Sequence, residues 1–575
     1  MAAPAGRRGA CRQLLAATLV GALLAGRCSA RAAGPASPPE SHYDVIILGV
    51  GMAGVAAARA LADAPSRPST LVLEARPRAG GRLHSVQTRE GAVDLGAMWI
   101  HDAGPGNALW ELARELRVNL SAPQDYSSAD LVLPDGRRAS LPLYAVRAAA
   151  RCAERRRWRA RLRGAGGGDG AARPPGARAP PRRWQAVYAS FQAQVRGRIA
   201  AMRANASAAA LNSSAGAGNA SAGAAAAVGD VPLSEIVGDW RRAHPGWRPE
   251  QELLADLIVH QQFEARGPRA PRRTATPARG ARPPPAAAPD VCAWRGARQT
   301  LLAANVSALS AAHFGNAKVI PAVDVLTRPG MDALVTRQLP GLNVSLDSTV
   351  TAISQDGVGV SVTLANGTTL RAAHALVTLP LGVLKARRVA FDPPLPLDKE
   401  RAIAEMGMGL LDKVVLVFPR VFWRAGADFL CLARRDGGGR WSTWLNYEKS
   451  MQLPVLVALN TADTARQLEH MSDAAVALAT MYGGGAGGGP VPAPLEAHVT
   501  RWGADPLARG AYSYYATGNP RNITRVLAQP HGRVLFAGEA TSDKPATVLG
   551  ALLSGRREAC RLLRLLGRAG AASPE

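Results

Sequence analysis

The first regular pattern along the chain is an apolar run at residues 42–48, HYDVIIL, which predicts a buried strand. The next residues, GVGMAGVAAARALADA, combine closely spaced glycines with an Ala-rich stretch, and this predicts a tight turn that opens a helix. A second apolar run, STLVLEA at residues 69–75, predicts another strand. Strand, glycine turn, helix and strand within about 30 residues are typical of the first βαβ unit of a dinucleotide-binding fold.

Later segments continue to alternate between helix-like and strand-like patterns of apolar residues. Residues 184–202 have helical spacing, whereas strand-like runs return at residues 343–364, 374–380 and 413–418, and a last strand with a long helix is predicted over residues 533–566. We therefore expect an α/β fold with mixed α+β character. Because cofactor-type segments stand near both ends, we expect its domains to be built from discontinuous pieces.

Low-complexity stretches interrupt this pattern at residues 151–183, 203–229, 266–290 and 483–494. They carry few large apolar side chains, so burial cannot offset the entropy lost on ordering, and we interpret them as disordered insertions. At 575 residues the chain is too long for one core. A prior of about 150 residues per domain suggests two to four domains.

The N-terminus has the layout of a secretory signal peptide over residues 1–30. Arg7, Arg8 and Arg12 precede an apolar run that is too short for a membrane span, and small residues follow it. An Arg-rich start without acidic residues is also typical of an organelle transit peptide, which stays open as the alternative. After removal of the leader we expect no stable membrane span.

Asparagine usage favours the secretory interpretation. Eight of the 13 Asn residues begin an Asn-x-Ser/Thr triplet, whereas chance would place about one or two there. We therefore expect a secreted or lumenal glycoprotein. The triplets begin at Asn119, Asn205, Asn212, Asn219, Asn305, Asn343, Asn366 and Asn522.

The net charge of +26 would suggest a nucleic-acid partner if it were spread over the folded part of the chain. Instead, residues 1–31, 151–183 and 266–282 together carry +20 of it. Such runs are more often solvated tails than nucleic-acid grooves, so we expect no nucleic-acid partner.

The cysteines do not indicate a metal site. A mature chain would keep four of the six, and none stands in a Cys-x-x-Cys or Cys/His cluster. One or two disulfides stay open. The four are Cys152, Cys292, Cys431 and Cys560.

The glycine turn has the spacing of a dinucleotide-binding motif. Gly49, Gly51 and Gly54 form Gly-x-Gly-x-x-Gly, and Glu74 lies 20 residues beyond the last glycine at the end of the next strand. Glycines allow close approach to a pyrophosphate at the helix N-terminus, and the carboxylate can accept hydrogen bonds from ribose hydroxyls.

The segments that follow resemble the flavin-containing amine oxidases, polyamine oxidase type. EARPRAGGRLHS places Arg78, Gly80, Gly81 and Arg82 directly after Glu74, and DLGAMWIHD follows it. Matching stretches appear in order as LVTLPLGVLKA, LLDKVVLVFPRVFW and RVLFAGEATSDKPATVLGALLSGRREA. The resemblance covers about residues 42–130 and 320–565, and it implies FAD as the cofactor.

The resemblance also implies a two-domain architecture, with a Rossmann-like FAD domain from residues 42–130, 320–384 and 503–566 and a substrate domain from residues 131–319 and 385–502. It assigns cofactor binding to the glycine turn, to the two segments after it and to the C-terminal motif. The residues are Gly49, Gly51, Ala53, Gly54, Glu74, Arg82, Gly96, Ala97, Met98, Trp99, Val350, Trp502, Glu539, Thr547 and Val548.

Three catalytic residues follow from the same resemblance. Lys413, at a strand start, matches the family's active-site lysine, which would hold a water and supply positive charge when oxygen takes up electrons. His101 stands in MWIH, where polyamine oxidases place a polar side chain beside the substrate, and Tyr512 stands where the family keeps an aromatic ring.

The expected reaction is FAD-dependent oxidation of a polyamine of the spermine or spermidine type. A carbon next to a nitrogen gives up hydride, the imine hydrolyses to an aldehyde and an amine, and O2 becomes H2O2. We expect a small polyamine and O2 as partners, and a monomer or weak dimer.

The sequence departs from the family pattern near the C-terminal motif. SDKPATVLG lacks the aromatic residue and has Leu549 where the family commonly has His, and Thr547 stands where some members place a second aromatic ring. These departures bear on substrate range.

Three other functions stay open for this chain. A lysine-specific histone demethylase shares the GAYSYY-like segment, but should lack a signal peptide and carry a long charged helical hairpin. An L-amino-acid oxidase needs an Arg that clamps a carboxylate. A basic nucleic-acid-binding protein with a decayed flavin fold would rest on charge that is confined to the insertions.

Overall fold

The structure is a computed structural model. It describes residues 42–124, 129–132, 138–141, 230–247, 323–423, 426–432, 443–473 and 491–568, together with some of the residues within 187–204 and 303–313, and residue 441. The predicted leader at 1–30, the insertions at 151–183 and 266–290, nearly all of 203–229 and residues 483–490 lie outside these ranges.

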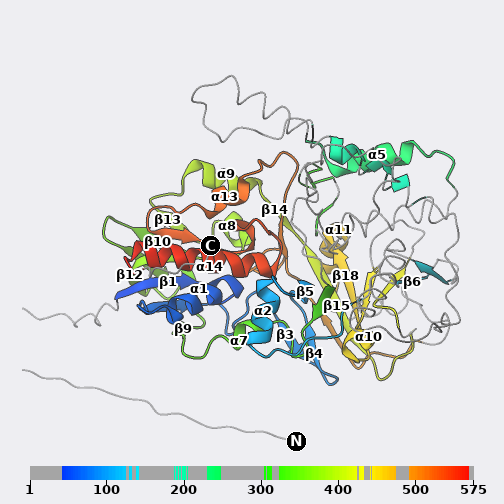
Figure 1. Ribbon diagram of the computed structural model, residues 1–575, viewed down its shortest axis with the longest axis horizontal. Helices are drawn as coiled ribbons and strands as arrows, with labels where there is room; N and C mark the ends of the chain where they lie inside the picture. The colour runs from blue at the N-terminus through cyan, green and yellow to red at the C-terminus, as the bar shows by residue number, and fades with distance from the viewer. Residues whose placement is uncertain are drawn as a thin grey trace, which may run out of the picture. The chain divides into compact units, whose positions relative to one another are not determined.

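An eight-stranded sheet organises the part of the molecule that holds both ends of the described chain (Figure 1). Its order is β13-β10-β11-β12-β1-β2-β9, and β21 pairs with the second half of β12. The run β21-β12-β1-β2-β9 is parallel, whereas β11 is antiparallel to its neighbours. The strands are β1 His42–Leu48, β2 Thr70–Leu73, β9 Val344–Ser345, β10 Val350–Gln355, β11 Val360–Leu364, β12 Thr369–Val377, β13 Ala390–Asp392 and β21 Val534–Phe536.

Both faces of this sheet are buried, which explains the unbroken apolar run in β1. Val45 and Ile47 point into one core, whereas Ile46 and Leu48 point into the other. The helices of the first core are α1 Met52–Asp63, α2 Ala108–Glu115, α7 Ala333–Thr336 and α14 Val548–Leu565. Those of the second are α8 Leu381–Lys385, α9 Leu397–Glu405 and α13 Ile523–Ala528.

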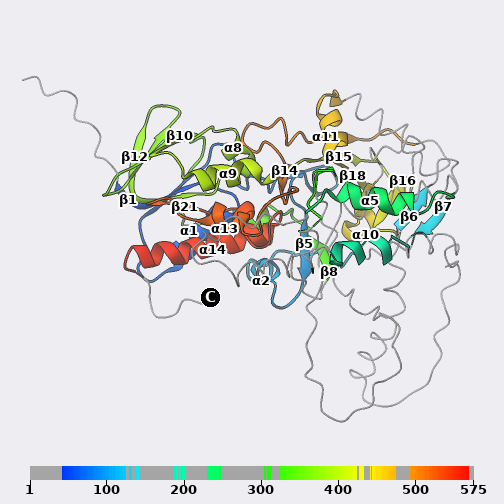
Figure 2. The same ribbon diagram turned by 90° about the horizontal axis from the view of Figure 1, so that it is seen from above.

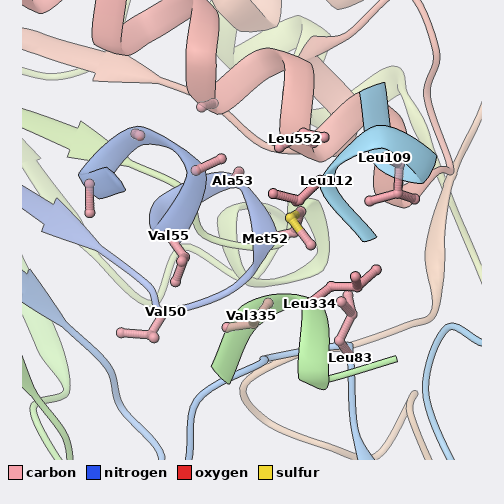
Figure 3. Close-up of a cluster of buried hydrophobic side chains, with 14 of the residues drawn as sticks. Val50, Met52, Ala53, Val55, Leu83, Leu109, Leu112, Leu334, Val335 and Leu552 are labelled. Atoms are coloured by element: carbon pink, nitrogen blue, oxygen red, sulfur yellow. The ribbon is translucent and has the colours of Figure 1, made fainter. Parts of the chain in front are cut away.

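Helices α1 and α14 lie side by side although about 500 residues separate them along the chain (Figures 1 and 2). A Cβ added at Gly555 would lie 2.2 Å from the carbonyl oxygen of Ala53, so the glycine permits this close approach. Figure 3 shows the core beneath them, where Met52 of α1, Leu112 of α2 and Leu552 of α14 converge. The packing brings the first turns of both helices to one region.

A second sheet of seven strands lies in the other part of the molecule, in the order β19-β15-β18-β17-β16-β6-β7. All its pairs are antiparallel except β16 with β6. The strands are β6 Ala129–Val132, β7 Arg138–Leu141, β15 Leu411–Val417, β16 Phe429–Leu432, β17 Thr443–Asn446, β18 Val455–Thr461 and β19 Glu496–Val499.

Alternate residues of β15 and β18 enter two cores. On one face, Val415 and Val457 meet α5, Leu233–Arg242, and the described helical residues between 187 and 201. On the other face, Val414 and Ala458 meet α11, Ala462–Glu469. The short helix α10, Tyr447–Met451, follows β17 directly.

Three two-stranded sheets and one 3-10 turn complete the described elements. They are β3 Ser85–Gln87 with β4 Ala92–Asp94, β5 Trp99–Ala103 with β8 Val323–Leu326, β14 Gly407–Gly409 with β20 Tyr512–Tyr514, and the 3-10 turn η2 at Glu539–Thr541.

The mixed α/β fold expected from the sequence is confirmed, and each predicted helix or strand segment contains a described element of its type. The proposed domain boundaries remain a prediction. Strand β13 and helix α9, which we placed in the substrate domain, pack with the first sheet and its second core. Cys431 is buried and Cys560 is a free cysteine, whereas Cys152 and Cys292 lie outside the described residues.

Candidate active site

A cavity of about 470 Å³ lies where the two parts of the molecule meet. Its lining comes from the β1–α1 turn, the end of β2, the first turn of α14, and the segments around β5, β15 and β20. Apart from Gly54, every residue that the sequence assigned to cofactor binding or catalysis lines this one cavity.

The three glycines of the turn differ in what prevents a side chain at each position. Gly49 has φ of +110°, and a Cβ at Gly54 would lie 1.9 Å from the carbonyl oxygen of Gly49, so both are required by the chain itself. Gly51 has φ of −85°, and its added Cβ would find its nearest neighbour 3.9 Å away, at the carbonyl oxygen of Gly80. Nothing in the chain forbids a side chain there. Because Gly51 lines the cavity, its missing side chain fits a bound group that comes close to the backbone.

The start of α1 suits the negative charge of such a group. Gly51 is its N-cap, and no side chain caps the first turn. Met52 and Ala53 of that turn line the cavity. Unpaired amides and the positive end of the helix dipole favour a phosphate at this position.

Glu74 joins the glycine turn to the end of β2. It is 6% exposed, and its carboxylate accepts hydrogen bonds from the amides of Val50 and Arg76, at 2.9 and 3.0 Å. These contacts hold the carboxylate at the cavity wall, where a ribose could meet its remaining lone pairs.

Glu539 ties three chain segments together at the cavity. Its carboxylate accepts from the guanidinium of Arg82 at 2.9 Å, the hydroxyl of Ser513 at 2.6 Å and the amide of Ala546 at 2.8 Å. Ala546 leads into α14, where Thr547 is the N-cap and Val548 begins the first turn. The buried Glu539 thus fixes the position of this helix N-terminus at the cavity.

Lys413 is the third residue of β15 and is only 2% exposed. Its ammonium donates to the carbonyl oxygens of Asp94 and Gly96, at 2.9 and 2.5 Å. Burial lowers the pKa of Lys413 to about 8, although the nearby Asp94 carboxyl acts in the opposite direction. Burial likewise raises the pKa of Asp94 to about 6. At neutral pH the cavity wall therefore carries a fixed cation.

Aromatic side chains also line the cavity. Tyr512 and Trp502 line the cavity, and the indole of Trp502 donates to the carbonyl oxygen of Leu95 at 3.2 Å. Desolvation and the charge of Glu539 raise the pKa of Tyr512, so its hydroxyl stays protonated. Trp99 and His101 also line it, with ring centroids 5.9 Å apart.

Two neighbouring carboxyl groups, the buried Asp412 and the half-buried Glu469, hold the loop that carries Trp502. Asp412, fully buried, accepts from the hydroxyl of Thr500 at 2.8 Å and the amide of Trp502 at 2.9 Å. Glu469 accepts from the amides of Gly503 and Ala504. Burial, with the neighbouring Glu469 carboxyl, raises the pKa of Asp412.

Sequence reasoning missed several residues that shape this site. Asp94, Asp412 and Asp324 do not line the cavity themselves, but each contacts or lies beside a residue that does. Asp94 and Asp412 lie within the family-like segments DLGAMWIHD and LLDKVVLVFPRVFW, so their position is the available signal. Asp324 lies in no such motif.

Among the described residues, no three His, Cys, Asp or Glu side chains converge as metal ligands would. Within the same residues, no helix combines the length and apolar character that a membrane crossing requires.

Comparison with known proteins places this geometry in a family. The sequence profile described as "Flavin containing amine oxidoreductase" matches residues 52–563. The chain is 29% identical to polyamine oxidase 2 of Arabidopsis thaliana over 531 residues, which cover 92% of this chain and 89% of that protein.

A shorter but closer match is to lysine-specific histone demethylase 1 homolog 2 of Oryza sativa subsp. japonica. It is 41% identical over 243 residues, which cover 41% of this chain. The match spans only 32% of the rice protein. A solved structure of putrescine oxidase bound to putrescine has the same fold, with a TM-score of 0.61 and 17% identity, and the match covers 92% of this chain and 100% of that one.

Proposed function

Because the chain belongs to the flavin-containing amine oxidoreductase family, we propose that it is an FAD-dependent oxidase of polyamines. One observation carries the proposal. A single cavity is lined by the glycine turn, by the N-termini of α1 and α14, and by Lys413, His101 and Tyr512. Cofactor-type and amine-facing residues thus share one space.

The cavity residues fit FAD. Gly51 leaves room at the helix N-terminus for a pyrophosphate, and Glu74 stands where a ribose would meet it. The first turn of α14 lines the same cavity, so its positive end can favour a flavin ring that gains negative charge. When bound, the flavin would accept a hydride from the amine carbon and pass the electrons to O2.

The side chains of this wall suit a neutral amine, which is the form that can give up hydride. Among the described lining residues, the carboxylates are Glu74 and Glu539, and both are held by main-chain amides or Arg82. Tyr512, kept protonated, adds an aromatic surface without negative charge. An amine that binds here is therefore not stabilised as an ammonium by a free carboxylate on the described wall.

Lys413 would act on the other half of the reaction. Its ammonium is fixed by two carbonyl oxygens, so the charge is already in place before any substrate binds. A preorganised cation at the cavity wall favours the negative charge that develops as O2 is reduced. His101 would meet a nitrogen of the substrate.

The lengths of the sequence matches favour a polyamine over a histone tail as the substrate. The likeness to polyamine oxidase 2 extends over 92% of this chain, whereas that to the rice demethylase homologue covers 41%. The demethylase reading keeps its support from the higher identity of that shorter match.

We also propose that the chain enters the secretory pathway. The leader pattern and the Asn-x-Ser/Thr triplets support this. Of the triplets within the described residues, Asn119, Asn343 and Asn366 are exposed, and Asn305 and Asn522 are half-buried. The other three lie outside those residues.

An anaerobic titration of the purified flavoprotein tests the activity. Spermine, spermidine, their acetylated forms, a methyl-lysine peptide and L-amino acids are added separately, and the flavin absorbance is followed. We expect a polyamine to bleach the flavin at the highest second-order rate. Bleaching by the methyl-lysine peptide alone would establish the demethylase reading instead, and a folded flavoprotein that no amine reduces would contradict both.

A further inference from the structure

Asp324 lies directly behind His101 in the small sheet formed by β5 and β8. In this sheet Ile100 pairs with Val325 and Ala103 pairs with Val323. Two residues of β5, His101 and Asp102, therefore face the single residue Asp324 of β8. This is a β-bulge, a device that changes the direction of a side chain relative to the strand.

The bulge has a strained backbone that its surroundings stabilise. Asp102 has φ of +50°, in the left-handed region that non-glycine residues seldom adopt. Asn107, 1% exposed, donates its side-chain amide to the carbonyl oxygens of His101 and Asp102, at 2.6 and 3.1 Å, and its oxygen caps the start of α2. The contacts hold the two bulge residues in one conformation.

The carboxylate of Asp324 contacts both residues of the bulge. Oδ1 accepts a hydrogen bond from the amide of Asp102 at 3.0 Å, and Oδ2 lies 3.1 Å from Nδ1 of His101. The second contact has an ion-pair distance, but it does not meet the geometry of a hydrogen bond. Asp324 is 5% exposed, and the His101 side chain is 14% exposed. The pair is thus largely shielded from solvent, and its imidazole reaches the cavity.

The same segment also supports Trp99, the other aromatic residue of β5 at the cavity. The side-chain oxygen of Gln124 accepts the indole N–H of Trp99 at 2.6 Å, and the main-chain N–H of Gln124 donates to the carbonyl oxygen of Asp324 at 3.0 Å. Asp324 is therefore linked to both rings of the MWIH segment.

We propose that Asp324 is a positioning residue that acts through His101 in the amine half of the reaction. Its carboxylate holds a proton on Nδ1, and Nε2 is then left to accept an N–H of the bound amine at the cavity. A carboxylate behind an imidazole fixes the tautomer and the ring orientation in this way. The inference rests on the proposed amine oxidase function.

A double-mutant cycle with Asp324→Asn and His101→Gln tests the proposal on the flavin-loaded protein. Asn keeps an oxygen for the Asp102 amide but removes the charge that faces the imidazole. We expect Asp324→Asn to lower the second-order rate of flavin reduction by spermine about 10- to 100-fold, the range for losing such a partner of a functional histidine. In the His101→Gln background, the same change should alter the rate by less than about twofold, since its effect passes through the ring.

The oxygen reaction and a control variant separate this role from a structural one. Reoxidation of the dithionite-reduced variant by O2 should stay near the wild-type rate. Asp428→Asn is the matched control, because Asp428 is 1% exposed, is paired with Lys449 at 2.7 Å and does not line the cavity. It removes a buried ion pair and should leave reduction by amine unchanged.

Two results would overturn the inference. One is a wild-type reduction rate in folded Asp324→Asn, and the other is an effect that multiplies in the double variant. If Asp324→Asn does not fold, Asp324→Glu keeps the charge on a longer side chain, and it must slow reduction without slowing reoxidation. If no amine reduces even the wild type, the proposed function fails first and this inference falls with it.

Discussion

Replacing Lys413 with Met removes the fixed cation of the cavity and keeps roughly the same volume. Two energy terms oppose each other. The lowered pKa, from 10.5 to about 8, corresponds to a cost of about 3 kcal/mol for keeping the buried ammonium charged at pH 7. The hydrogen bonds to Asp94 and Gly96 contribute about 1.5–3 kcal/mol each in the other direction. The free energy of unfolding should therefore change by no more than about 3 kcal/mol.

The effect on the oxygen reaction should be much larger than the effect on stability. Stopped-flow mixing of the dithionite-reduced Lys413→Met holoenzyme with O2 should show reoxidation about 100-fold slower than in the wild type, the range for losing one preorganised polar group. In the wild type, the rate should fall as pH rises through about 8, where Lys413 loses its proton. The variant should lack this step.

Stability against pH gives a second readout that needs no turnover. The folded pKa of Lys413 lies below the unfolded value, so between pH 8 and 10.5 the folded state binds fewer protons than the unfolded state. The contribution of Lys413 to stability therefore rises with pH across this window, by about 3 kcal/mol. Lys413→Met should lose that rise.

The chain offers a closely matched control in Lys399. It is also 2% exposed, its ammonium also donates to two carbonyl oxygens, and burial also lowers its pKa to about 8. It does not line the large cavity. Lys399→Met should change stability in a similar way and leave reoxidation unchanged. Equal slowing in both variants, or no slowing in Lys413→Met, would refute the catalytic role of Lys413.

Three further predictions follow from the same structure. Gly51→Val should keep the fold but lose bound FAD, measured by the flavin absorbance per protein, whereas Gly54→Ala should lower the melting temperature because its Cβ meets the carbonyl oxygen of Gly49; flavin retained in folded Gly51→Val would contradict the cofactor assignment. Asp412→Asn should remove a loss of stability that the wild type shows as pH rises from about 4 through its raised folded pKa; parallel melting curves for both proteins from pH 5 to pH 9 would contradict this. Protein from a eukaryotic secretory host should lose mass on deglycosylation, and Asn366→Gln should remove one glycan; unprocessed, unglycosylated protein in the cytosol would disprove the location.

The local elements could be predicted because their signals are local. The apolar run of β1 and the glycine turn before α1 specify a strand buried on both faces and a helix that begins beside it. The assignment of Lys413, His101 and Tyr512 to one site needed the family resemblance, since these residues lie on three strands that are far apart in the sequence. Spacing alone also could not separate Gly51 from Gly54, because the difference depends on what each missing Cβ would meet in three dimensions.

Asp324 shows most clearly why part of the site could not be predicted. It is one acidic residue in a short strand, VDVL, and it faces His101 only because β8 pairs with a strand more than 200 residues earlier. Its position opposite His101 depends further on the bulge, which adds one residue to β5 between Ile100 and Ala103. Neither strand carries a local pattern for this pairing. A motif can identify the residue that meets the substrate, but the residue that fixes its protonated nitrogen is determined by strand register, which is a property of the folded chain.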